Sequence, residues 1–127
     1  MNATTSKDYG DVVVQVFTDC DCDHLSAALA ERYHLKRVYI GFENGAWIHS
    51  LVEHPEAGLY LDVNGVQTFE EVQANWEHCE DWDGIYPHPE TDRPEERDRH
   101  RPEIPVSAGI ALVTQAAADF GLLLRRR

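Results

Sequence analysis

The sequence contains no long apolar run and no secretion signal, and its number of cysteines is odd. No hydrophobic stretch approaches the roughly 20 residues that a membrane-spanning helix needs, and no basic-then-apolar segment opens the chain. These absences predict a cytoplasmic protein without membrane contact. The three cysteines are Cys20, Cys22 and Cys79, and the first two are too close together for an ordinary structural disulfide. Free thiols, a metal site or a reactive thiol remain as explanations.

Basic residues are also scarce. The 127 residues include 23 Asp and Glu but only 11 Lys and Arg, which gives a formal net charge of −12. Such a surface should not bind nucleic acid directly, because phosphates require Lys and Arg. It can bind a basic protein surface, occupy a groove meant for nucleic acid, or simply keep the protein soluble. With 43% hydrophobic residues and no internal repeat, residues 1–127 are expected to form a single domain.

The residue pattern predicts an α+β fold, in which an N-terminal helix packs on a small antiparallel sheet and two further helices follow. Strands are predicted from β-branched or alternating segments, and helices from apolar residues at helical spacing. The predicted strands are residues 11–17, 37–42, 46–52 and 59–63, and the predicted helices are residues 22–34, 69–79 and 106–121. The polar residues 1–10 predict a flexible N-terminus.

Turn and cap residues support several of these boundaries. The Asn44-Gly45 pair is a strong tight-turn signal, so the strands within residues 37–63 should form a three-stranded antiparallel meander. Thr68 and Glu71 match a capping box at the start of a helix. Gly121 ends the last predicted helix as its C-cap.

A histidine and a carboxylate should meet in the hairpin of this meander. If Val52 pairs with Leu59 to close the hairpin, directly opposed residues have numbers that sum to 111. His49 then stands opposite Asp62, with Cβ atoms roughly 5 Å apart. The hairpin therefore predicts an imidazole held by a carboxylate, which is two thirds of a nucleophilic triad.

Cys22 opens the first predicted helix. It lies three residues before Leu25 and seven before Leu29, so it shares the apolar stripe of that helix. A thiol at a helix N-terminus has a lowered pKa, because the helix dipole and free N–H groups stabilise the thiolate. Three aspartates around it act in the opposite direction, since like charge raises the pKa of a thiol. They are Asp19, Asp21 and Asp23.

Together these residues predict a catalytic triad. Cys22 is the predicted nucleophile, His49 the general base and Asp62 the carboxylate that orients the imidazole. The backbone N–H of Cys22 is a candidate donor to an oxyanion hole. The alternative is that Cys22 is a small buried hydrophobic residue and that His49 and Asp62 form a satisfied structural pair.

The order of a cysteine at a helix start, a histidine on a following strand and an aspartate one hairpin later resembles papain-like and transglutaminase-like folds. The stretch Asp21-Cys22-Asp23-His24-Leu25 resembles the D-C-S-G-L of cell-wall peptidases of the NlpC type, and departs from it at Asp23 and His24. Over residues 18–80 the chain looks like small uncharacterised bacterial and phage proteins. The resemblance implies a papain-like topology and a thiol enzyme that acts on an amide or thioester of a protein or peptide-like substrate, without a cofactor.

Two other functions fit parts of the sequence. The first is metal binding. Cys20, Cys22 and His24 are soft or borderline donors in one short segment, and other residues are available to complete a zinc site. These are His49, His54, His78, Cys79 and His88, although their spacing matches no common zinc motif.

The second is a non-catalytic acidic inhibitor or binding protein of the phage type. It would block a host nuclease or a nucleic-acid-guided defence complex through a basic groove, with residues 19–23 and 77–83 as its acidic contact patches.

Residues 86–105 contain five prolines and many charges, which predicts a loop that serves as a lid or partner-binding segment or is a mobile excursion.

Overall fold

The computed structural model describes residues 5–19, 22–79, 82–88 and 105–126. Helices and strands alternate irregularly along these residues. In chain order the elements are α1 (Thr5–Asp19), α2 (Cys22–Tyr33), β1 (Lys36–Gly41), β2 (Trp47–His54), β3 (Leu59–Asp62), β4 (Gly65–Gln67), α3 (Phe69–Trp76), β5 (Gly84–Pro87) and α5 (Val106–Phe120).

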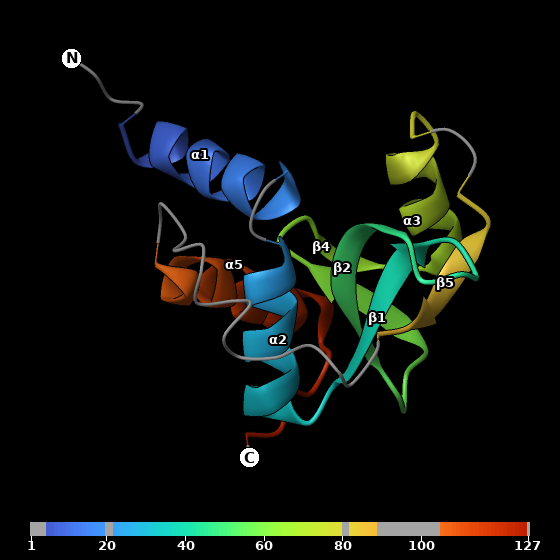
Figure 1. Cartoon of the computed structure of the whole chain (residues 1–127). Helices are drawn as coiled ribbons and strands as arrows, with labels where there is room; N and C mark the ends of the chain where they lie inside the picture. The colour runs from blue at the N-terminus through green and yellow to red at the C-terminus, as the bar shows by residue number, and fades with distance from the viewer. Residues whose placement is uncertain (1–4, 20–21, 80–81, 89–104, 127) are drawn as a thin grey trace.

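The strands form one antiparallel sheet in the order β4-β3-β2-β1-β5. Helices α1, α2 and α5 lie together on one side of the sheet, and α3 lies on the other side (Figure 1). This arrangement confirms the predicted α+β class with helices packed on a small antiparallel sheet. None of the described helices is long and apolar enough to cross a membrane.

Both faces of the sheet are buried, each in its own hydrophobic core. Leu51 and Val52 are neighbours in β2 and enter different cores, because successive side chains of a strand point to opposite faces. The first core joins the sheet to α1, α2 and α5 and includes Val13, Phe17, Leu25, Leu29, Val52, Leu61 and Val113. The second joins the sheet to α3 and includes Val38, Ile40, Leu51, Val72 and Trp76.

Helix α1 corrects two predictions. The sequence predicted a flexible segment at residues 1–10 and a strand at 11–17, whereas α1 begins within the first segment and runs through the second. Val13 and Phe17 are four residues apart and both buried, while Val12 is 46% exposed. That spacing is the stripe of a helix. Packing of the stripe against α2 and α5 outweighs the strand propensity of the β-branched residues.

The other predicted elements are present, and the sheet is larger than predicted. The capping box of Thr68 and Glu71 opens α3, and Gly121 ends α5 in the left-handed conformation. The meander of β1, β2 and β3 gains two edge strands, β4 and β5. Strand β5 includes the first two residues of the predicted loop at 86–105, and residues 89–104 of that loop lie outside the described residues. Pro87 is tolerated there because it ends an edge strand.

Candidate functional site

The ladder between β2 and β3 differs in register from the prediction. It pairs Val52 with Leu61 and His54 with Leu59, so the numbers of opposed residues sum to 113 rather than 111. The predicted opposition of His49 and Asp62 is therefore wrong. A shift of two residues keeps every side chain on its predicted face, because the period of a strand is two. The two side chains still meet, with His49 Nε2 2.8 Å from Asp62 Oδ2.

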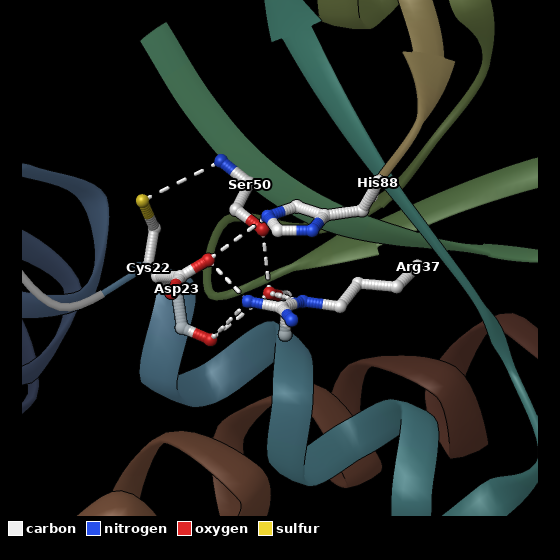
Figure 2. Close-up of polar contacts among 6 residues, drawn as sticks. Cys22, Asp23, Arg37, Ser50 and His88 are labelled. Carbon is white, nitrogen blue, oxygen red and sulfur yellow. Dashed lines mark hydrogen bonds and ion pairs between the residues drawn. The ribbon is translucent and has the colours of Figure 1, made fainter. Parts of the chain in front are cut away.

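Cys22 lies at the point where the described pairing of β2 with β3 ends. The Ser50 N–H donates to Cys22 Sγ over 3.4 Å (Figure 2). If the ladder continued at the same register, Ser50 would face Val63 of the chain that follows β3. The thiol thus takes the place of a backbone acceptor in the sheet. Since α2 begins at Cys22, the N-terminus of that helix lies against strand β2.

His49 lies fully buried between Asp62 and the Cys22 thiol. Its ring stacks on Trp76 of α3, with centroids 4.4 Å apart and planes at 23°. Burial alone would lower the pKa of His49, but the hydrogen bond to Asp62 and the adjacent Cys22 thiol outweigh that effect and raise the pKa to about 9. Nε2 is engaged by Asp62, and Nδ1 has no hydrogen-bond partner among the described residues. Nδ1 is therefore the ring nitrogen of His49 that can interact with the Cys22 thiol.

A chain of amides fixes the carboxylate of Asp62. Asp62 Oδ1 accepts the Asn64 N–H and the Gln67 side-chain N–H, each over 2.8 Å. Gln67 Oε1 in turn accepts a hydrogen bond of 2.8 Å from the Asn75 amide. Oδ2 is left to face His49. Gln67, Asn75 and Trp76 were not predicted as residues of the site. The signal for Gln67 was a polar residue soon after the Asn64-Gly65 turn, and the signal for Trp76 was its place on the apolar stripe of the helix that follows Thr68.

A second polar cluster lies near Cys22 (Figure 2). Asp23 pairs with Arg37 of β1 and with His88, whose Nε2 lies 3.1 Å from Asp23 Oδ1. Arg37 Nε donates to Ser26 Oγ over 3.0 Å, and Ser26 Oγ lies 2.6 Å from Ser50 Oγ. Burial favours the neutral acid, but the hydrogen bond with His88 and the charge of Arg37 hold the pKa of Asp23 below its usual value.

These contacts change the expected electrostatics of the thiol. From the sequence, Asp23 was expected to oppose the Cys22 thiolate as a like charge, whereas its carboxylate is compensated by Arg37. Asp19 is described only as the last residue of α1, and Cys20 and Asp21 lie outside the described residues. Among the aspartates around Cys22, only Asp23 therefore has a described side chain.

The candidate triad is closed to solvent. Cys22 is 4% exposed and Asp62 is 3% exposed. The crevice beside them is too narrow to admit a water molecule. Its walls come from α1, α2, β2 and β3 and include Phe17, Leu25, Ser26, Leu29, Ser50, Leu51 and Leu61. Chemistry at Cys22 thus requires part of this wall to move.

The histidines and cysteines considered for zinc do not gather within the described residues. No group of three or more His, Cys, Asp or Glu side chains is placed there to hold a metal ion. His54, for example, is engaged elsewhere, with Nε2 2.8 Å from the Leu123 carbonyl oxygen and Nδ1 accepting the Ala57 N–H.

Comparison with known proteins adds no relative. No protein-family model matches the chain, and no curated protein or solved structure is significantly similar to it. The resemblance to papain-like enzymes therefore stays a prediction. Any functional conclusion has to rest on the residues and contacts described above.

Proposed function

We propose that this chain is a papain-like thiol enzyme that cleaves or transfers an acyl group at an amide or thioester bond. Cys22 is the nucleophile, His49 the general base and acid, and Asp62 the residue that orients the imidazole. One observation carries the proposal: a fully buried imidazole bonded to a carboxylate through Nε2, with Nδ1 left beside a thiol at a helix N-terminus. A purely structural pair would not need the second nitrogen unpaired, because a buried polar atom without a partner costs about 1–3 kcal/mol.

The protonation states suit nucleophilic attack. A pKa of about 9 keeps His49 protonated at neutral pH, and a neighbouring imidazolium stabilises the Cys22 thiolate. The thiolate attacks the carbonyl carbon and forms a sulfur–carbon bond, while the carbonyl π electrons move to oxygen. When the intermediate collapses, the bond to nitrogen or sulfur of the leaving group breaks, and the imidazolium proton passes to that group.

Water completes the cycle. It attacks the thioester while His49 accepts a proton from it, which releases the carboxylic acid and restores the thiolate and imidazolium. Asp62 stabilises the protonated ring and holds its orientation throughout. The N–H of Ser50 bonds to the sulfur in the closed site, and this donor becomes available for the substrate oxygen when the sulfur moves.

The test is the reactivity of each cysteine with iodoacetamide as a function of pH, followed by mass spectrometry. We expect Cys22 to be alkylated below pH 7, and His49→Ala or Asp62→Asn to remove that acid-side reactivity. Cys79 is half-buried in the same molecule and serves as the internal control. If Cys22 reacts only above pH 8 in the folded protein, as an ordinary thiol does, the enzyme proposal is wrong.

A second candidate is an acidic protein that binds a basic peptide or protein surface. A surface groove of about 240 Å³ favours it, because exposed Glu77 and Asp83 border apolar and aromatic side chains there. The other lining residues are Phe69, Gln73, Cys79, Trp82 and Gly84.

Binding of a lysine-rich peptide, measured by calorimetry, separates this function from catalysis. Glu77→Lys with Asp83→Lys should abolish binding, whereas Cys22→Ala should leave it intact. Charge reversal at the exposed Glu31 and Glu56, which do not line the groove, is the control matched in net charge. Equal loss with both reversals would mean that only net charge matters.

A further inference from the structure

The cluster around Asp23 has the composition of a receptor for a carboxylate. Arg37 and His88 both contact the Asp23 side chain, and Ser26 Oγ accepts from the same guanidinium. We propose that Arg37, His88 and Ser26 form a carboxylate-binding subsite beside Cys22, which Asp23 fills in the closed state and a carboxylate of the substrate fills in the open state. The inference rests on the proposed function and names its substrate class: acyl compounds with a carboxylate near the reactive carbonyl.

The geometry of the cluster supports a receptor rather than a chance surface ion pair. Asp23 is held by groups from two strands, since Arg37 lies in β1 and His88 follows β5. Arg37 Nη2 contacts both the Asp23 side chain and the Asp23 carbonyl oxygen, the latter over 3.2 Å. The side chains of Arg37, His88 and Asp23 are 15%, 7% and 23% exposed, so the site is partly shielded from solvent. A guanidinium and an imidazole in such a place recognise carboxylates well, because charged hydrogen bonds strengthen when water is excluded.

The position of the cluster relative to Cys22 suits a substrate. Asp23 directly follows the nucleophile in the first turn of α2, and Ser50 bonds to Cys22 through its N–H and contacts Ser26 through its hydroxyl (Figure 2). Ser50 of β2 therefore links the thiol to Ser26 of the carboxylate receptor.

Displacement of Asp23 also offers a way to open the closed site. The contacts of Asp23 tie the start of α2 to β1 and to the end of β5. A substrate carboxylate that takes over Arg37 and His88 releases these ties while it brings its carbonyl to Cys22. A neutral substrate leaves Asp23 in place. The internal carboxylate thus acts as a competitor that favours acidic substrates.

Two alkylating reagents of nearly equal size test the subsite. Iodoacetate carries a carboxylate next to its reactive carbon, whereas iodoacetamide is neutral, and both lose iodide when the thiolate forms the sulfur–carbon bond. In Asp23→Ala, the rate of Cys22 alkylation by iodoacetate should saturate with concentration and be inhibited by acetate. The ratio of the iodoacetate rate to the iodoacetamide rate should rise at least about tenfold over wild type, the factor expected for one charge-assisted hydrogen bond. Iodoacetamide should show a linear dependence on concentration.

Control variants separate a binding site from general electrostatics. Asp23→Ala combined with Arg37→Gln has the same net charge as wild type and should lose both the saturation and the raised ratio. Glu31→Ala removes one exposed acid from the same helix and should leave the ratio at its wild-type value. Asp23→Asn keeps the side-chain volume, and circular dichroism on every variant confirms that it is folded.

Each outcome has a separate meaning. If Cys22 of Asp23→Ala reacts with both reagents at the wild-type rate ratio and without saturation, the proposed carboxylate subsite is wrong. The enzyme proposal is not affected by that result. If Cys22 reacts with neither reagent in folded Asp23→Ala and Asp23→Asn at any pH below 8, the proposed function fails and the subsite fails with it. If the rate of alkylation by iodoacetate still saturates in the variant that combines Asp23→Ala with Arg37→Gln, the proposed role of Arg37 is wrong.

Discussion

His49 Nε2 and Asp62 Oδ2 lie 2.8 Å apart although the register of the sheet places Leu51, not His49, opposite Asp62. The contact is diagonal, and it forms next to the last described pair of the ladder between β2 and β3. Diagonal neighbours in a sheet are farther apart than opposed ones and meet only through side chains that reach across. The pair therefore depends on how each side chain is held, by Trp76 on one side and Gln67 on the other.

The stability of the protein should depend on pH through His49. Its pKa is about 9 in the folded protein, above the ordinary value of 6.5. A group whose pKa is raised by folding stabilises the fold fully below its unfolded pKa and loses that contribution as pH rises through the folded pKa. The free energy of unfolding should therefore fall by on the order of 3 kcal/mol between about pH 6.5 and pH 9. Urea denaturation across this range measures it.

The matched variant for this measurement is His49→Gln, which does not titrate. Its free energy of unfolding should change much less over the same pH range. Parallel curves for the two proteins would contradict the raised pKa of His49.

The amide chain behind Asp62 should contribute to stability as well as to orientation. Gln67→Leu removes a donor to Asp62 Oδ1 and the acceptor of the Asn75 amide. Because Asp62 and Gln67 are buried, we expect a loss of about 1–3 kcal/mol in the free energy of unfolding. Gln73→Leu, at an exposed position of α3, is the control and should change stability by less than about 0.5 kcal/mol. Equal effects of the two substitutions would argue against the amide chain.

The packing of α1 on α5 can be tested at Gly109. A Cβ at this position would lie 3.0 Å from Phe17 Cδ2 and 3.1 Å from Leu25 Cδ1, and both of these side chains are buried. Gly109→Ala should therefore destabilise the fold by about 1–3 kcal/mol, despite the better helix propensity of alanine. Ser107→Ala, exposed on the same helix, should be neutral in thermal denaturation. A rise in Tm with Gly109→Ala would show that Phe17 has room to move.

Two helix ends offer a matched pair of substitutions. His34 follows α2 with φ of 56°, and Gly121 follows α5 with φ of 84°, both in the left-handed region. Side chains with a Cβ are strained there, so His34→Gly should stabilise the protein by about 1 kcal/mol. Gly121→Ala should destabilise it by a similar amount, because nothing lies within 4 Å of the added Cβ and only the backbone strain changes. Chemical denaturation of both variants at one pH checks the opposite signs.

Local signals in the sequence were sufficient for several elements. The capping box of Thr68 and Glu71 acts within four residues, and Gly121 ends α5 through contacts with its own last turn. The faces of β2 were also predicted from alternation, which is why His49 and Ser50 lie on opposite sides as expected. The meeting of His49 with Asp62 survived the wrong register because a shift of two residues preserves the face.

Contacts between distant segments depend on the tertiary structure and could not be predicted from the sequence. Residues 11–17 have the composition of a strand and became a helix, because Phe17 is buried against Gly109 and Leu25. The register of β2 and β3 was open, since alternation cannot distinguish pairings that differ by two residues. The pairing of Asp23 with His88 joins positions 65 residues apart. No spacing rule predicts such a contact, because its energy comes from the folded arrangement of strands β1 and β5 and not from neighbouring residues in the chain.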